Sequence, residues 1–349
     1  MNVKKLIAIP ALAMVTLLSS HVQAKESYKV CWSHYTGWEP YALLEQTGIL
    51  EKWEDKYDID IEITLINDYI ESINLYTAGE FDACTMTNMD ALTIPAVGGI
   101  DSTALILGDF SNGNDGIVIK NGNSVKDLKG KSVKLVELSV SHYLLSRALE
   151  QNGLKERDVN IMNTSDADIA SVFMSEDNAA VVTWNPPLQV VQNMKGAVKV
   201  FDSSEIPEEI MDVLIVKTNA DIKLKKALTG AWYELMQKLA KRDSESAQLR
   251  ALMAANAGAT NAEFDAQMKT TRMFYKASEA VSVFESEKAI ETMDYVRKFS
   301  FEHGLFGNGA NSVDFIGIEF PGNKVLGNKG NIKLRFDSSF MTMAANGEL

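Results

Sequence analysis

The stretch SVKLVELSVSHYLLSRALEQNGL, residues 132–154, decides the fold class. It begins as a short apolar strand and continues with the apolar spacing of a helix. Gly153 stands where a glycine closes a helix in the left-handed conformation. The next elements are a strand at 159–165, a short helix at 166–176 and a strand at 179–187. Residues 132–187 therefore predict a β-α-β-α-β unit.

The same order of elements occurs once before in the chain. The earlier copy has strands at 28–35, 59–67 and 81–88 and helices at 39–53 and 68–80. Gly48 closes its first helix, as Gly153 does in the later copy. Strands that alternate with helices of this length form parallel sheets through right-handed crossovers. The repeat predicts an α/β protein with two doubly wound lobes.

Single passes of the chain link these two units. Residues 103–120 contain two strands around a turn rich in Gly and Asn, and residues 208–221 contain another strand. We predict that these passes are two hinge strands, that residues 25–112 and 213–349 form lobe 1, and that residues 113–212 form lobe 2.

The C-terminal third has a different pattern. Apolar residues on one face of residues 225–242 predict an amphipathic helix, and helices are expected across about 245–303. The tail from Gly304 is rich in Gly and Asn and has strand-like pieces at 314–320 and 331–336. We expect the tail to pack on lobe 1.

Residues 1–24 have the features of a secretory signal peptide. Lys4 and Lys5 precede an apolar run at 6–18, and the small-residue sequence VQA at 22–24 is typical of a cleavage site. The apolar run is too short to span a bilayer. We therefore expect an exported protein that is located in the periplasm.

The charge balance argues against two classes of partner. Without the two lysines of the predicted signal peptide, the chain has 32 basic and 47 acidic side chains and a formal charge of −15. Nucleic acid and anionic membranes both require a basic surface, and the sequence contains no basic stripe.

Cys31 and Cys84 lie in apolar, strand-like segments. The prediction that we favour is two buried, unpaired thiols, with a disulfide as the alternative that export permits. A zinc site is not expected, because no histidine or further cysteine stands at ligand spacing. The histidines His34, His142 and His303 are far apart in the sequence, and no metal or cofactor is predicted.

Candidate ligand-binding residues follow from the architecture. In open α/β sheets, ligands bind outside the carboxyl ends of the strands. The segments after the predicted strands contain aromatic rings, carboxylates and helix starts with free N–H groups. The predicted ligand-binding residues are Trp38, Glu39, Thr87, Asn88, Asp90, Asp109, Glu137, Ser139, Ser141, His142, Trp184 and Asp212.

Several of these candidates also have a structural explanation. Asp90 and Ser141 are suitable helix caps, Asp109 and Asp212 are suitable hinge residues, and Trp184 is suitable for packing between the lobes. Aromatic walls with this many carboxylates suit a flat neutral or cationic nitrogen compound better than an anion.

Residues 132–154, with the pattern Ser-x-Ser-His-Tyr-Leu-Leu, resemble the substrate-binding proteins of ABC importers for nitrate, aliphatic sulfonates, taurine and bicarbonate. LYTAGEFDA at 75–83 and the tryptophan before two prolines at 184–187 agree with this resemblance, which covers about residues 28–300. It implies a periplasmic binding protein type II-like fold. The tail is similar to that of binding proteins encoded beside urea carboxylase pathways, some of which are associated with guanidine.

This resemblance implies a small-molecule solute, urea or guanidinium in class, and delivery of that solute to an ABC permease in the inner membrane. Trp38-Glu39 and Asn88-Met89-Asp90 replace the small neutral loops common in sulfonate binders, which argues against a sulfonate ligand. A monomer without enzymatic activity is expected.

Other functions remain as alternatives. One is a binding protein for a sulfonate, taurine or nitrate-type anion, and another is a ligand sensor that acts on a receptor. An enzyme similar to the pyrimidine synthases of thiamine biosynthesis shares the fold, but the cysteine-rich motif of those enzymes is absent here.

Overall fold

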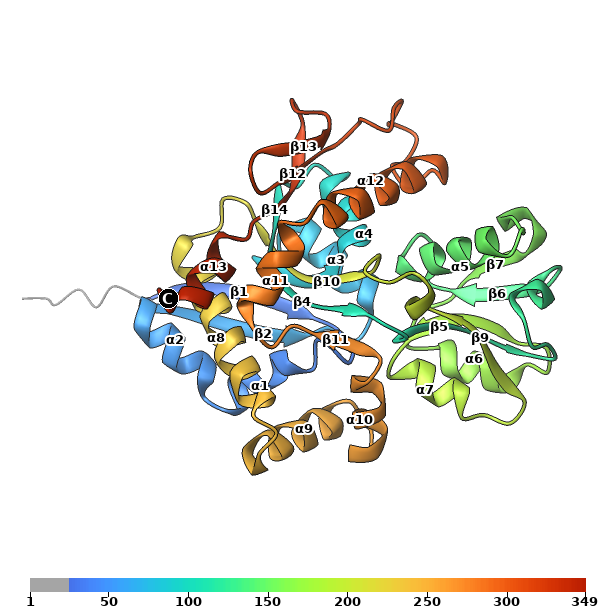
Figure 1. Ribbon diagram of the computed structural model, residues 1–349, viewed down its shortest axis with the longest axis horizontal. Coiled ribbons are helices and arrows are strands. Elements are labelled where there is room, and N and C mark those ends of the chain that lie inside the picture. The colour runs from blue at the N-terminus through green and yellow to red at the C-terminus, as the bar shows by residue number, and fades with distance from the viewer. Residues whose placement is uncertain (1–24) are drawn as a thin grey trace, which may run out of the picture.

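The computed structural model describes residues 25–349, so the predicted signal peptide lies outside the described residues. Within this range the chain forms two α/β lobes, each built around its own sheet (Figure 1). We call the part around the nine-stranded sheet lobe 1 and the part around the five-stranded sheet lobe 2. The two-lobed α/β architecture predicted from the repeat is confirmed.

Lobe 1 contains both ends of the described chain. Its strands are β1 (Glu26–Trp32), β2 (Ile59–Leu65), β3 (Ala83–Thr87), β4 (Ser102–Ser111), β10 (Met211–Lys217), β11 (Thr271–Met273), β12 (Gly317–Phe320), β13 (Lys324–Gly327) and β14 (Ile332–Phe336). Their order across the sheet is β13-β12-β14-β4-β10-β3-β1-β2, with β11 paired to β4. Strand β2 at the edge alternates buried and exposed residues, whereas the central strand β3 is buried throughout, as its position requires.

The helices of lobe 1 cover its sheet and extend beyond it (Figure 1). They are α1 (Pro40–Gln46), α2 (Ile49–Tyr57), α3 (Tyr69–Ala78), α4 (Asn88–Ala91), α8 (Ile222–Ala240), α9 (Ser244–Asn256), α10 (Asn261–Met268), α11 (Ala277–Phe284), α12 (Glu287–Glu302) and α13 (Ser339–Asn346). The predicted amphipathic helix at 225–242 is α8. The stretch predicted as helical at 245–303 is interrupted by β11, a correction, because this short strand satisfies its backbone groups by pairing with β4.

Lobe 2 contains the second copy of the repeat. Its elements are β5 (Asp115–Lys120), β6 (Ser132–Leu135), α5 (Val140–Gln151), β7 (Asn160–Asn163), α6 (Ile169–Ser175), β8 (Ala180–Trp184), α7 (Pro187–Gln192) and β9 (Ala197–Asp202). Their order across the sheet is β7-β6-β8-β5-β9.

Strand pairing confirms the predicted repeat. In lobe 1, β1 pairs in parallel with β2 and β3, and in lobe 2, β6 pairs in parallel with β7 and β8. Gly153 follows α5 with φ of 72°. Gly48 has φ of 69°, but here the chain starts a second helix at once, so the segment predicted as one helix is α1 and α2. The left-handed glycine turns the helix axis rather than ending the helical region.

The tail packs on lobe 1, as expected. Strand β14 adds to the sheet beside β4, and β12 and β13 continue it outward. Phe336 of β14 stacks on Phe320 of β12, with ring centroids 4.9 Å apart.

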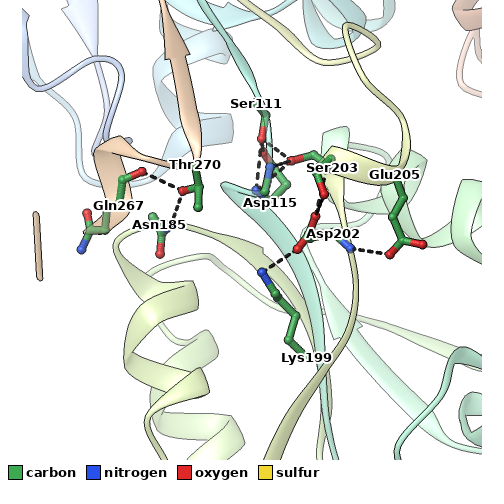
Figure 2. A network of polar contacts seen from close by, with 11 residues as sticks. Ser111, Asp115, Asn185, Lys199, Asp202, Ser203, Glu205, Gln267 and Thr270 are labelled. Carbon is green, nitrogen blue, oxygen red and sulfur yellow. Dashed lines mark hydrogen bonds and ion pairs between the residues drawn. The ribbon is translucent and has the colours of Figure 1, made fainter. Parts of the chain in front are cut away.

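The chain crosses between the lobes in two segments, 112–114 and 203–210. Hydrogen bonds hold these crossings together (Figure 2). The hydroxyl of Ser203 lies 2.6 Å from that of Ser111 and accepts from the Gly113 N–H at 2.7 Å. The Ser111 hydroxyl in turn donates to Asp115 Oδ2 at 2.5 Å. The two crossing segments are therefore joined to each other by hydrogen bonds.

The cysteines form a disulfide, so the favoured prediction of two unpaired thiols is wrong. Cys31 of β1 and Cys84 of β3 are paired residues of neighbouring parallel strands, with Cα atoms 4.5 Å apart. Apolar surroundings are compatible with free thiols and with a disulfide alike. Only the register of β1 and β3 brings the two sulfur atoms together.

Removing this cross-link should lower stability. The variant Cys31→Ala/Cys84→Ala should lose about 2–4 kcal/mol of unfolding free energy, because the bond closes a chain segment with a sequence separation of 53. Thermal unfolding followed by circular dichroism is the appropriate measurement, since urea and guanidinium are candidate ligands. An unchanged melting temperature would contradict a stabilising role for the bond.

Candidate functional site

A small cavity lies between the lobes, beside the hinge. Its volume is about 10 Å³, measured as the space open to the centre of a water molecule. That is about the minimum that holds one water molecule, so a larger solute requires the walls of the cavity to move apart from this closed conformation. The lining residues are Tyr35, Trp38, Tyr69, Thr87, Asp115, Val140, Trp184 and Asp212.

Strand register explains why distant residues meet here. In lobe 1, Asp212 of β10 is paired with Thr87 of β3 on one side and with Asp109 of β4 on the other. In lobe 2, Asp115 of β5 is paired with Trp184 of β8. Each sheet thus presents a row of side chains at the edge that faces the other lobe.

Aromatic rings form most of the cavity wall. The ring centroid of Trp38 lies 4.9 Å from that of Tyr35 and 5.6 Å from that of Tyr69. Trp184 of lobe 2 meets Tyr69 edge to face at 5.4 Å. All of these side chains are buried, and the Nε1 atom of Trp38 has no hydrogen-bond partner among the described residues. Faces of this kind attract flat or cationic groups.

Buried carboxyl groups stand at and behind this wall. Asp115 and Asp212 line the cavity, and Asp109 lies beside Asp212 and accepts a hydrogen bond from the Tyr35 hydroxyl at 2.8 Å. Asp90 accepts hydrogen bonds from the hydroxyls of Tyr69, at 2.6 Å, and Thr87, at 2.8 Å.

Burial shifts the titration of these carboxyl groups. It raises the pKa of Asp115 to about 7 and that of Asp90 to about 6, because water no longer stabilises the charged form. Burial, together with the neighbouring carboxyl, also raises the pKa of Asp212. Burial also raises the pKa of Asp109. Oδ2 of Asp109 and of Asp212 and Oδ1 of Asp90 have no hydrogen-bond partner within residues 25–349.

Gly37 is required beside this cluster. A Cβ atom at this position would lie 2.2 Å from Asp109 Oδ2 and 2.7 Å from the Tyr35 ring. The glycine therefore allows the backbone between Tyr35 and Trp38 to approach the carboxyl group.

The lobes touch directly beside the cavity. Trp184 Nε1–H of lobe 2 donates to the His34 carbonyl of lobe 1 at 3.2 Å. The Tyr69 N–H of lobe 1 donates to Asp166 Oδ1 of lobe 2 at 3.4 Å. These bonds require the lobes to be closed, so the structure describes the shut form of the cleft.

Several residues predicted for the site are placed at the cavity or directly behind it. Trp38, Thr87, Trp184 and Asp212 line the cavity, and Asp90 and Asp109 stand behind it. Glu39 is fully buried next to Trp38, but its Oε1 pairs with His34 Nδ1 at 2.7 Å. Burial raises the pKa of Glu39, and the hydrogen bond to Glu39 raises the pKa of His34.

Other predicted residues have partners elsewhere. Asn88 joins α4 to the second crossing, since it donates to the Glu209 carbonyl and accepts from the Met211 N–H. His142 Nε2 lies 3.1 Å from Glu156 Oε1, away from the cavity. Glu137 is exposed.

The serines at the start of α5 are buried. The hydroxyl of Ser139, the N-cap, donates to the Val136 carbonyl and accepts from the Ser141 N–H. The Ser141 hydroxyl has no partner among residues 25–349. Neither serine lines the cavity.

Tyr69 is the main residue that the sequence analysis missed. It is the first residue of α3, directly after the loop that follows β2. The rule that ligands bind beyond strand ends identifies this position when β2 is included with the other strands of the repeat. Val140, Tyr35 and Asp115 also line the cavity and are not among the predicted ligand-binding residues.

The arrangement can surround a small guest with aromatic faces and offer carboxyl oxygens to its N–H groups. No lysine, arginine or histidine is among the residues that line the cavity in the described part of the chain. Residues 25–349 contain no cluster of histidine, cysteine, aspartate or glutamate suited to a metal ion. None of the helices described combines the length and hydropathy needed to cross a membrane.

Solved structures of other proteins share the fold. The alkanesulfonate-binding protein SsuA of Xanthomonas axonopodis pv. citri, bound to MOPS, superposes with a TM-score of 0.66 at 15% identity, covering 81% of this chain and 94% of that protein. The periplasmic nitrate-binding protein NrtA of Synechocystis PCC 6803 superposes with a TM-score of 0.68 at 11% identity, covering 93% and 89%.

Sequence comparison places the chain in a family. A Brucella abortus protein named as a binding protein is 26% identical over 173 residues, which is 49% of this chain. The chain spans about half the length of the curated relatives it matches, 52% for this one. Residues 53–241, more than half of the chain, match the family described as NMT1/THI5 like. This protein therefore belongs to the NMT1/THI5-like family.

Proposed function

We propose that this protein is the periplasmic solute-binding component of an ABC importer, and that it captures a small planar nitrogen compound of the urea or guanidinium class. The lobes close on the solute and release it to a permease of the inner membrane. The protein acts as a monomer and catalyses no reaction. The structural neighbours that bind sulfonate and nitrate share its fold, which supports the general role.

The observation that carries the proposal is the composition of the cavity wall. Four aromatic rings and the carboxyl groups of Asp115 and Asp212 face one small space. A planar guest can stack on rings while its N–H groups donate to carboxyl oxygens, including the unpartnered Oδ2 of Asp212. Guanidinium satisfies both requirements, and urea satisfies them with a weaker electrostatic attraction.

The same wall disfavours an anionic solute. A sulfonate or nitrate ion would enter a dry space that contains carboxyl groups and, among the residues described, no cationic side chain. The repulsion between like charges costs several kcal/mol where water is excluded. The anion-binding alternative is therefore not favoured by the geometry.

Calorimetric titration with guanidinium, urea, taurine and nitrate tests the proposal. We expect guanidinium to bind more tightly than urea, and taurine and nitrate to bind at least a hundredfold more weakly than guanidinium, which corresponds to about 3 kcal/mol. Thermal shift gives an independent ranking, because a ligand that binds the folded state raises its melting temperature. Tight binding of taurine or nitrate, with none of guanidinium or urea, would refute the assignment.

A further inference from the structure

Three carboxyl groups meet where the hinge strands enter the lobes. Asp109 stands near the end of β4, Asp115 begins β5, and Asp212 stands near the start of β10. Asp109 and Asp212 are directly paired across the antiparallel strands β4 and β10, so their side chains lie on the same face of the sheet. Both are buried, and the Oδ2 atom of each lacks a hydrogen-bond partner within residues 25–349.

Among residues 25–349, the titratable groups that face this pair supply no positive charge. They are Tyr35 from the β1–α1 loop, Tyr41 from α1, Asp115 from β5 and Tyr275 from the β11–α11 loop. Asp115 in turn faces Asp90 and Asp202. The tyrosines are neutral at physiological pH, because burial raises the pKa of each above its ordinary value.

Two adjoining carboxyl groups in such a place cannot both be ionised. The energy of two negative charges at contact distance, without water or a cation, is too high, and one proton is retained by the pair. The pair then titrates as a unit. A solute that brings its own positive charge changes this balance, because it stabilises the doubly ionised state.

We propose that the cleft binds its solute as a cation, and that this cation replaces the proton held between Asp109 and Asp212. The inference rests on the proposed function, and it specifies that the charged member of the urea–guanidinium class is the cargo. On closure, N–H donors of the cation bind the carboxylate oxygens, and the displaced proton passes to solvent. The charge inside the cleft is the same before and after the exchange.

The exchange predicts a pH dependence that separates the two solutes. A solute that displaces one proton loses about tenfold in affinity for each pH unit by which the medium is acidified, as long as the empty pair holds its proton. Neutral urea displaces no proton, so its affinity should not fall on acidification. In the empty cleft, the carboxyl pair keeps its proton up to a higher pH than an ordinary aspartate does. The reason is that burial and the neighbouring Asp109 carboxyl raise the pKa of Asp212.

Calorimetry of the mature protein with guanidinium chloride tests this directly. Titrations at about pH 6.5, in two buffers of different ionisation enthalpy, report the number of protons released. We expect close to one proton per guanidinium, and a guanidinium affinity that is at least tenfold weaker at about pH 5.5 than at about pH 7.5.

Two variants sharpen the test. Asp109→Asn leaves Asp212 to contact the solute but removes the paired carboxyl, so guanidinium should still bind, with fewer protons released and a shallower pH profile than in the parent protein, because burial alone still raises the pKa of Asp212. Glu62→Gln removes an exposed carboxyl of β2 and should retain both the release and the slope. Guanidinium binding to the parent protein with identical heats in both buffers and equal affinity at both pH values would overturn this inference while leaving the proposed function in place. Absence of guanidinium binding would overturn this inference, and absence of binding of both guanidinium and urea would overturn the proposed function as well.

Discussion

Replacement of Trp184 with alanine should weaken guanidinium binding at least tenfold. The indole is the aromatic wall that lobe 2 contributes, and it meets Tyr69 of lobe 1 at 5.4 Å. A desolvated cation–π contact contributes about 2 kcal/mol, which exceeds the 1.4 kcal/mol that corresponds to a tenfold change. Alanine also removes the hydrogen bond from Nε1 to the His34 carbonyl, so the closed state loses a direct contact between the lobes.

Trp184→Phe separates these contributions. Phenylalanine keeps a ring face but has no N–H donor, so it should restore most of the affinity that alanine loses. Calorimetry measures both variants, and circular dichroism establishes that they are folded. An unchanged affinity in a folded Trp184→Ala protein would show that the indole is packing alone, the alternative role considered for it.

Replacement of Asp212 with asparagine should weaken guanidinium binding about a hundredfold or more. Asp212 lines the cavity, is 2% exposed and has an oxygen without a partner in the described structure. Removing one partner of a buried charge pair costs about 3–5 kcal/mol, because the cation loses a carboxylate that contacts it inside the cleft. Urea should lose far less, since it brings no charge into the cleft.

The same substitution should not destabilise the empty protein at neutral pH. A carboxyl whose pKa is raised by folding contributes stability that is present at acidic pH and lost as the pH rises through its folded value. An asparagine side chain does not ionise, so the variant does not lose stability as the pH rises. The melting temperature of the empty variant should therefore equal or exceed that of the parent protein at about pH 7.5. Glu62→Gln is the matched control and should leave both affinity and melting temperature unchanged. Equal guanidinium affinity in Asp212→Asn and the parent would contradict the role given to this carboxyl.

The repeat made the architecture predictable from the sequence. Two β-α-β-α-β units and single linking passes specify two lobes, and the rule for strand ends then selects Trp38, Thr87, Trp184 and Asp212 without any coordinates. These four residues meet because strand order determines where strand ends lie, which depends on topology and not on side-chain detail.

Other features depended on register and on competing partners, which the sequence does not specify. Cys31 and Cys84 form a bond only because β1 and β3 align them. Asn88 directly follows β3, and His142 lies in the first turn of α5. Asn88 nevertheless donates to the Glu209 carbonyl, and His142 pairs with the Glu156 carboxylate away from the cavity. A residue that follows the end of a strand lies at the correct edge of the sheet. Which hydrogen-bond partners are available nearby then determines where its side chain points.

The most direct test of the central claim is a crystal structure of the mature protein grown with guanidinium. We predict one planar molecule between Trp38 and Trp184, with N–H groups within hydrogen-bond distance of the Asp212 carboxylate. A closed cleft that holds only water at this position, with guanidinium absent or bound elsewhere on the surface, would contradict the account.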